Sequence, residues 1–135
     1  MNKEDEVVCY IILRRDLNMS TGKSVAQGGH ALQYMLAEVN DYYDQCELFN
    51  DKPDMPEFKS WIDEWQASNV KVVLGVDSEQ ELDNLCKQVS DAGYIINWVI
   101  DEGRTEVAPD SLTAACIQPM PRKIAKPFVG HLRLL

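Results

Sequence analysis

The sequence contains no grouping of cysteines of the kind that binds zinc. Its four cysteines are far apart and form neither a CxxC pair nor a Cys/His cluster: Cys9, Cys46, Cys86 and Cys116. This spacing argues against a zinc site. Cys9, Cys86 and Cys116 lie in apolar stretches, so we expect them to be small core residues of a protein in a reducing compartment.

Targeting signals and long apolar runs are also missing. The first six residues (MNKEDE) are acidic, and the apolar run after them is too short for a signal peptide. There is no Arg-rich transit peptide, and no stretch approaches the roughly 20 residues that a membrane-spanning helix needs. We therefore expect a cytoplasmic protein without a membrane segment.

Internal repeats, low-complexity tracts and Pro/Gly/Ser-rich linkers are absent as well. The chain has 135 residues, of which 45% are hydrophobic and 26% charged. These values are typical of one globular domain, which we expect to span residues 1–135.

Positive charge is scarce, and the formal net charge is −9. Residues 38–83 hold 13 acidic and 3 basic side chains (net −10), whereas the remainder holds 9 acidic and 10 basic ones (net +1). The acidity is thus confined to one stretch. A basic face for a nucleic acid is compatible with this distribution if the segments outside that stretch converge in space.

Apolar, β-branched runs predict four strands, at residues 7–15, 70–76, 94–100 and 112–117. Helical periodicity, capping residues and breakers predict helices from 22 to at least 39, and at 55–67, 79–92 and 122–128. Trp61 and Trp65 of the second helix are expected in the core or as dimer anchors rather than as base-stacking platforms. Residues 40–57, which are acidic and contain Pro53 and Pro56, are expected to form a loop or insertion.

The predicted helix at 22–39 has two distinct sides. At about 100° per residue, one side collects an apolar stripe for packing: Val25, Gly29, Leu32, Leu36 and Val39. Roughly the opposite side collects a polar stripe: Lys23, Gln27, His30 and Tyr34. Ser20 or Thr21 is placed to cap the helix start.

Gly22, Lys23 and Ser24 open this helix directly after a strand and a turn. A phosphate-binding loop would need another glycine at position 17, which is Leu17, so this is not a Walker motif. A lysine and free N–H groups at a helix start can nevertheless bind an anion or a developing oxyanion. Taken alone, Lys23 is better explained as a solvated first-turn lysine.

A second candidate segment is the polar turn at residues 101–109 (DEGRTEVAP), between two predicted strands. It combines a carboxylate, a guanidinium and a hydroxyl in a turn constrained by Gly103 and Pro109. Loops at strand ends often carry function in α/β proteins, although a polar connection with a local ion pair is the commoner case.

Taken together, the two segments resemble the archaeal and eukaryotic type of peptidyl-tRNA hydrolase, the type 2 family. The resemblance is carried by Gly22-Lys23, the run AQGGHA at 26–31, Asp101-x-GRTEVAP at 101–109 and Thr113, with further matches at KVVL (71–74), Pro119 and the final GHLRLL. It extends from about Val7 to Leu135, interrupted only between Glu38 and Glu57.

The resemblance implies an α/β fold: a single compact layered domain with a four-stranded mixed sheet and helices on both faces. It implies no metal and no cofactor, peptidyl-tRNA as the substrate, and a homodimer as a possible assembly. The family's catalytic lysine, aspartate and two threonines fall on Lys23, Asp101, Thr105 and Thr113. Gln27, His30, Arg104 and Gly22 are further expected substrate-binding positions.

Ester hydrolysis needs an activated water and stabilisation of a tetrahedral oxyanion. We expect Asp101 to orient or deprotonate the water, and Lys23 to stabilise the oxyanion or to keep Asp101 ionised. Thr105 and Thr113 are expected to position water or ribose hydroxyls. Arg104 either binds phosphate or pairs with a neighbouring glutamate; the sequence favours neither.

Two features depart from the family pattern. Asp110-Ser111 replaces the usual Gly-Thr and adds a carboxylate near the expected site, and residues 40–57 are longer and more acidic than usual. The alternative reading is a catalytically inactive family member that acts as an RNA- or protein-binding module. Retention of Lys23, Asp101, Thr105 and Thr113 argues against it.

Overall fold

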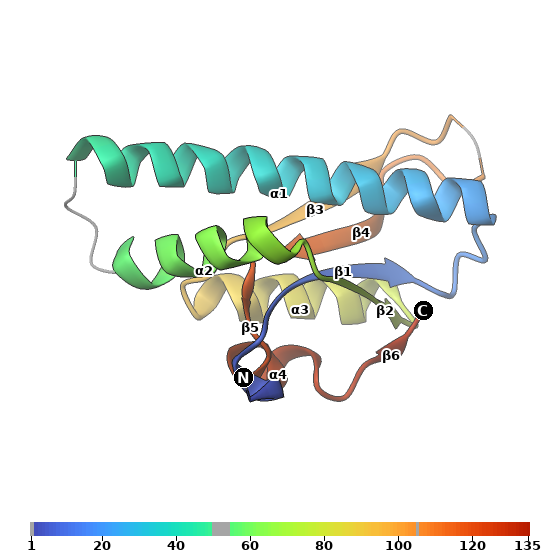
Figure 1. The fold of residues 1–135 in the computed structure, drawn as a ribbon. Coiled ribbons are helices and arrows are strands. Elements are labelled where there is room, and N and C mark those ends of the chain that lie inside the picture. The colour runs from blue at the N-terminus through green and yellow to red at the C-terminus, as the bar shows by residue number, and fades with distance from the viewer. Residues whose placement is uncertain (1, 50–54, 105) are drawn as a thin grey trace.

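A computed structural model of the protein describes residues 2–49, 55–104 and 106–135. The element order is η1 (Lys3–Asp5), β1 (Val7–Arg14), α1 (Thr21–Phe49), α2 (Met55–Ser68), β2 (Lys71–Val76), α3 (Glu79–Asp91), β3 (Ile96–Asp101), β4 (Ser111–Ile117), β5 (Met120–Pro121), α4 (Arg122–Val129) and β6 (Arg133–Leu134). The described part of the chain is a mixed α/β domain (Figure 1).

Within residues 2–49, 55–104 and 106–135, the sheet is mixed and has six strands. Its main path is β3-β4-β1-β2-β6, and β5 pairs with the beginning of β1. β1 is parallel to β2 and antiparallel to β4, and β3 is antiparallel to β4. The prediction of a mixed sheet is confirmed, but the predicted number of four strands is wrong. β5 and β6 are only two residues long each, too short to show hydrophobic periodicity.

β1 is the central strand, and all eight of its residues are buried. Alternate residues of a strand face opposite sides of the sheet. Ile11 and Leu13 face α1, whereas Arg14 reaches Glu79 of α3. Figure 1 shows α1 and α3 on opposite sides of the strands, as the prediction of helices on both faces requires.

α1 extends well beyond Val39, and its buried face is rotated from the predicted one. Residues 40–49 continue the helix instead of forming a loop, and 55–57 already belong to α2. The buried stripe contains Gly28, Ala31, Met35 and Val39, while Val25 and Gly29 are exposed. Small residues at 28 and 31 let the helix approach the sheet closely: a Cβ on Gly28 would lie 3.6 Å from Ile11 Cγ2.

The predicted core cysteines and tryptophans are confirmed. Cys9, Cys86 and Cys116 are free and buried, and Trp61 and Trp65 of α2 belong to the main core cluster. Among the described helices, none is long and apolar enough to cross a bilayer.

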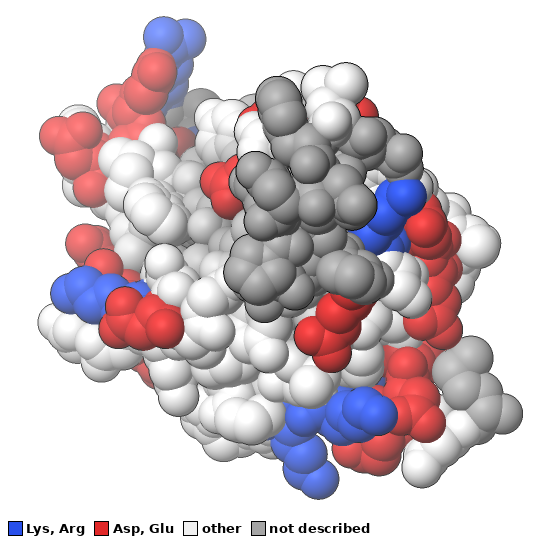
Figure 2. Space-filling model, turned by 90° about the vertical axis from the view of Figure 1, so that its left-hand side faces the viewer, with Lys and Arg blue, Asp and Glu red and all other residues white. Residues whose placement is uncertain are grey.

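The basic segments do not converge. α4 follows β5, which pairs with Val7 and Val8 at the start of β1, whereas the 101–111 turn lies at the other end of β1, where Arg14 contacts Leu112. Two of the α4 cations are paired with η1 or its flank, Arg122 with Glu6 and Lys123 with Asp5. Figure 2 shows another end of the molecule, where blue side chains form small groups among red ones. The cations of α4 and those near the 101–111 turn therefore lie at different ends of β1.

Candidate active site

The start of α1 and the end of β3 meet in one cleft of about 540 Å³, which we call the α1–β3 cleft. Its lining includes the whole predicted polar stripe of α1 together with the end of β3 and the turn after it: Lys23, Ala26, Gln27, His30, Tyr34, Val99, Ile100, Asp101, Glu102, Arg104 and Glu106. Lys23 lies in the first turn of α1, and its side chain lines this cleft.

A nearly buried ion pair lies at the cleft. The Lys23 ammonium donates a hydrogen bond of 2.6 Å to Asp101 Oδ1, and the two side chains are only 12% and 9% exposed. Because few waters screen the pair, its attraction is much stronger than that of a surface ion pair.

Asp101 accepts two further hydrogen bonds. Gln27 Nε2 donates to Oδ1 at 3.1 Å, and the Gly103 N–H donates to Oδ2 at 2.8 Å. The hydrogen bond from Lys23, followed by that from the Gly103 N–H and the charge of Lys23, outweighs the effect of burial and holds the pKa of Asp101 below its ordinary value of 3.8. The carboxyl group is therefore ionised at neutral pH.

Gln27 links Asp101 to Thr113. Its Nε2 also donates to Thr113 Oγ1 at 2.8 Å, and both Gln27 and Thr113 are buried. The Thr113 hydroxyl is within 3.5 Å of the Val99 carbonyl oxygen, to which it can donate. Thr113 therefore lies behind the ion pair, where it can hold Gln27 in place.

Gly103 fixes the turn that carries Asp101. It has a φ of 77°, and a Cβ at this position would lie 2.6 Å from Pro109 Cγ and 2.7 Å from Pro109 N. Only glycine fits such a backbone without displacing its neighbour. The same turn places the Gly103 N–H within hydrogen-bond distance of the Asp101 carboxylate.

Glu106 makes a contact that was not predicted from the sequence. Its Oε1 accepts a hydrogen bond of 2.7 Å from the Ser20 N–H, and its Oε2 accepts one from Ser20 Oγ. Ser20 Oγ in turn accepts the Lys23 N–H at 3.1 Å, which confirms Ser20 as a cap of α1. Glu106 thus fastens the turn after β3 to the helix start that carries Lys23. Its place between Thr105 and Val107 in the matched motif was the available signal.

The other predicted site residues lie outside the hydrogen bonds that hold the Asp101 carboxylate. His30 is exposed and lines the cleft, and Gly22 is exposed next to Lys23. Arg104 is 83% exposed and pairs with Glu102 at 2.7 Å, so the neighbouring-glutamate reading describes its contact here. Thr105 lies outside the described residues.

Within the described ranges, no group of three or more His, Cys, Asp or Glu side chains could hold a metal ion. The chemistry that the cleft offers is that of a fixed ammonium, a fixed carboxylate and nearby N–H donors. This set suits reactions in which negative charge develops on an oxygen.

Comparison with known proteins shows which family the chain resembles. The family model described as "Peptidyl-tRNA hydrolase PTH2" matches residues 7–135. A protein named peptidyl-tRNA hydrolase from Methanocaldococcus jannaschii is 35% identical over 127 residues, which cover 93% of this chain and 96% of the relative. Proteins of the same name from Aeropyrum pernix (32% over 127 residues; 92% of each chain) and Pyrobaculum aerophilum (31% over 131 residues; 96% and 98%) are also similar.

Proposed function

Because the chain belongs to the peptidyl-tRNA hydrolase PTH2 family, we propose that it hydrolyses the ester between a peptide and the 3′-ribose of tRNA in the α1–β3 cleft. The observation that carries this proposal is the hydrogen bond of 2.6 Å between the Lys23 ammonium and the Asp101 carboxylate. The product would be free tRNA, recycled from peptidyl-tRNA that has left the ribosome.

In the proposed mechanism, Lys23 stabilises the oxyanion. A lysine ammonium has three N–H donors, and Asp101 takes one of them. The others remain for the oxygen of the ester carbonyl, which becomes negative when water adds to the carbonyl carbon. A fixed cation at that point lowers the barrier because its position does not have to be reorganised during the reaction.

Asp101 orients the attacking water. Its Oδ1 is occupied by Lys23 and Gln27, whereas Oδ2 accepts only the Gly103 N–H among the described residues. An oxygen has room for a further hydrogen bond, so Oδ2 is the atom that faces the water. The lowered pKa of Asp101 makes it a weak base, so it takes the water's proton only as the bond from the water oxygen to the carbonyl carbon forms. That proton passes to the ribose 3′-oxygen as the ester C–O bond breaks.

Gln27 and Thr113 act through Asp101 rather than on the substrate, since both are buried. Thr105, Arg104, His30 and Gly22 remain proposed contacts to the ribose, the phosphate or the water. Arg104 would have to exchange Glu102 for a phosphate, and both groups are exposed enough for that exchange.

A homodimer is a further proposal. Next to β6 the surface has an apolar hollow of about 620 Å³ that includes Gly28, Gly29 and Leu32. Val25 and Leu134 are 70% and 73% exposed in its lining. Exposed apolar side chains that lie together are typical of interaction sites. Equilibrium sedimentation of the wild type and of Val25→Glu would test the assembly, with a dimer expected only for the wild type.

We propose the cytoplasm as the location, because peptidyl-tRNA arises there during translation. No observation on the described residues favours the inactive binding module.

The test of the catalytic proposal is release of N-acetylamino acid from N-acetylaminoacyl-tRNA. The wild type should turn over, and Lys23→Met and Asp101→Asn should each lose about 10²–10³-fold in kcat. Lys126→Met, an exposed lysine of α4, is the matched control and should retain full activity. Folded Lys23→Met and Asp101→Asn proteins with wild-type rates would refute the site, and an inactive wild type would refute the function.

A further inference from the structure

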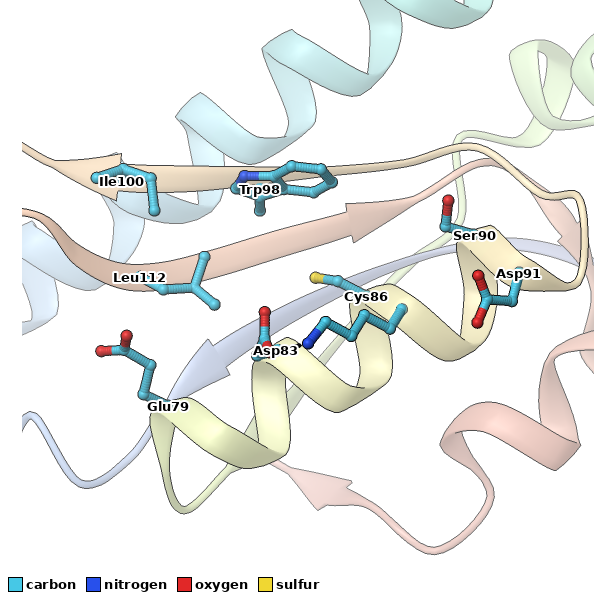
Figure 3. Close-up of a pocket in the computed structure, with 9 residues that line it drawn as sticks. Glu79, Asp83, Cys86, Ser90, Asp91, Trp98, Ile100 and Leu112 are labelled. Atoms are coloured by element: carbon cyan, nitrogen blue, oxygen red, sulfur yellow. Dashed lines mark ion pairs between the residues drawn. The ribbon is translucent and has the colours of Figure 1, made fainter.

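A second hollow lies on the other side of β3, between that strand and α3, and we call it the β3–α3 groove. It measures about 370 Å³ and is lined by Trp98 and Ile100 of β3, Leu112 of β4 and one side of α3: Glu79, Asp83, Cys86, Lys87, Ser90 and Asp91. Figure 3 shows the three apolar side chains of the strands above α3, with acidic side chains along the helix. The mechanism described above does not use this groove.

The groove and the α1–β3 cleft meet at Ile100, which lines both. β3 is the last strand of the sheet on this side, so no further strand separates the two hollows. A register shift occurs between Val99 and Ile100. Such irregularities change the direction of neighbouring side chains, and they are common next to active sites. A substrate bound at Asp101 can therefore continue across the edge of β3 into the groove.

The floor of the groove is apolar and open to water. Trp98 is 50% exposed and Ile100 is 49% exposed. A tryptophan with half of its surface in water gains free energy when a ligand covers it. Both side chains line the groove, so a ligand lying in it can cover both.

The rim of the groove is acidic. Glu79, Asp83 and Asp91 outnumber Lys87 in the lining. Asp83 is paired with Lys87 at 3.0 Å and Glu79 with Arg14 at 3.1 Å, so Asp91 contributes most of the negative charge that is left for a ligand. A tRNA backbone would bring phosphates against these carboxylates, which repel them. A peptide carries no phosphate, and its protonated amino terminus or basic side chains would be attracted. The acidic rim therefore favours binding of the peptide over binding of the RNA.

We propose that the β3–α3 groove binds the peptidyl part of the substrate, with apolar side chains over Trp98 and Ile100 and positive groups near the α3 carboxylates. This inference rests on the proposed function, because it takes the ester to lie at Lys23 and Asp101. The tRNA must then approach from another side of the α1–β3 cleft.

The proposal sets a minimum peptide length. Trp98 lies three positions before Asp101 in an extended strand, which spans about 10 Å at 3.3–3.4 Å per residue. A single blocked amino acid therefore does not reach Trp98, whereas a peptide of about four residues does. The groove should distinguish long substrates from short ones.

The experiment compares two substrates that share the same tRNA and the same esterified residue: N-acetylaminoacyl-tRNA and a tetrapeptidyl-tRNA with leucines at the second and third positions from the ester. In Trp98→Ala, kcat/KM for the tetrapeptidyl substrate should fall about tenfold, and kcat/KM for the short substrate should change less than about twofold. Leu48→Ser, which removes a 75% exposed apolar side chain elsewhere on the surface, should leave both values unchanged.

A second variant tests the charge without touching the apolar floor. Asp91→Lys places a cation at the C-terminal end of α3, where the helix dipole favours it, so the fold should be preserved. It should lower kcat/KM about threefold for a tetrapeptide with lysine at the third position and raise it for one with glutamate there.

Equal losses on the short and long substrates in Trp98→Ala would overturn the proposal, as would no loss on either. A gain in binding of deacylated tRNA by Asp91→Lys, without any effect of peptide charge, would show that the groove faces RNA. Failure of the proposed function would be seen separately, as a wild type that does not hydrolyse even the short substrate.

Discussion

The two sides of β3 differ in the burial and the hydrogen bonding of their side chains. On the α1 side, charged and amide groups are buried and held by specific hydrogen bonds, as in the contacts of Asp101 with Lys23 and Gln27. On the α3 side, Trp98 and Ile100 are half exposed, and the carboxylates lie at the rim. A fixed polar arrangement suits chemistry, because its dipoles are already oriented. An open apolar strip suits a ligand of variable sequence.

If this contrast is right, changes on the α1 side should reduce the rate on every substrate. Changes on the α3 side should affect only substrates that reach it. The following variants test the first half of the contrast, in order of decreasing effect.

Gln27→Met should have the largest effect. Methionine fills a similar volume but donates no hydrogen bond, so Asp101 loses one donor and buried Thr113 Oγ1 loses its bond to residue 27. We expect kcat to fall about 100-fold and the free energy of unfolding to fall by about 1–3 kcal/mol. Single-turnover kinetics and urea denaturation measure the two quantities.

Gln80→Met is the matched control for that variant. Gln80 is exposed on α3 and bonds only Asn84 among the described residues, at 2.8 Å. It should change neither quantity. A Gln27→Met protein with normal kcat would show that the buried amide is not needed to place Asp101.

Glu106→Gln should have an intermediate effect. The amide leaves only one oxygen to accept a bond from Ser20, so the turn after β3 is held less firmly to the start of α1. We expect about a tenfold lower kcat with little change in KM, because the distance between Lys23 and Asp101 becomes less well defined. Glu102→Gln removes a charge from the same turn and should leave kcat unaltered; equal losses in both variants would point to charge instead of position.

Asp110→Gly should have the smallest effect. Asp110 has a φ of 63°, a left-handed conformation that glycine adopts without strain. Removing this carboxylate near the cleft should lower KM for the tRNA substrate about twofold and leave kcat unchanged. Asp110→Ala removes the same charge but should destabilise the fold by about 1–2 kcal/mol. A similar stability of the two variants would contradict the conformational argument.

Much of the fold was predictable because long periodic segments carry strong signals. The four long strands and the start of α3 at Glu79 follow directly from the sequence. Ser78 caps this helix, and its Oγ accepts the Glu81 N–H at 3.0 Å. The end of α1 did not, because its acidic residues resemble a loop when read alone. There the helix is supported by contacts that only the fold creates, such as the 2.7 Å bond from Tyr43 to Asp63 of α2.

The site was predictable to a similar degree. The meeting of Lys23 with Asp101 was expected from the combined motifs, and Gln27 was expected one turn beyond Lys23. The burial of Thr113 was not, since it depends on how closely α1 packs on β4. The bond between Glu106 and Ser20 joins residues 86 positions apart, and no local pattern reports such a contact.

The Lys23–Asp101 pair also predicts a pH dependence. Because the pKa of Asp101 is lowered in the folded protein, the pair stabilises the fold above the ordinary carboxyl value of 3.8. This contribution is lost as the pH falls through the lower, folded-state pKa.

The most direct test of the account is the titration of the Asp101 carboxyl carbon by NMR in the wild type and in Lys23→Met. We expect a pKa below 3.8 in the wild type and a higher pKa in the variant, since the ammonium is the largest cause of the shift. The same pKa in both proteins would contradict the claim that Lys23 and Asp101 form one ionised pair at the cleft.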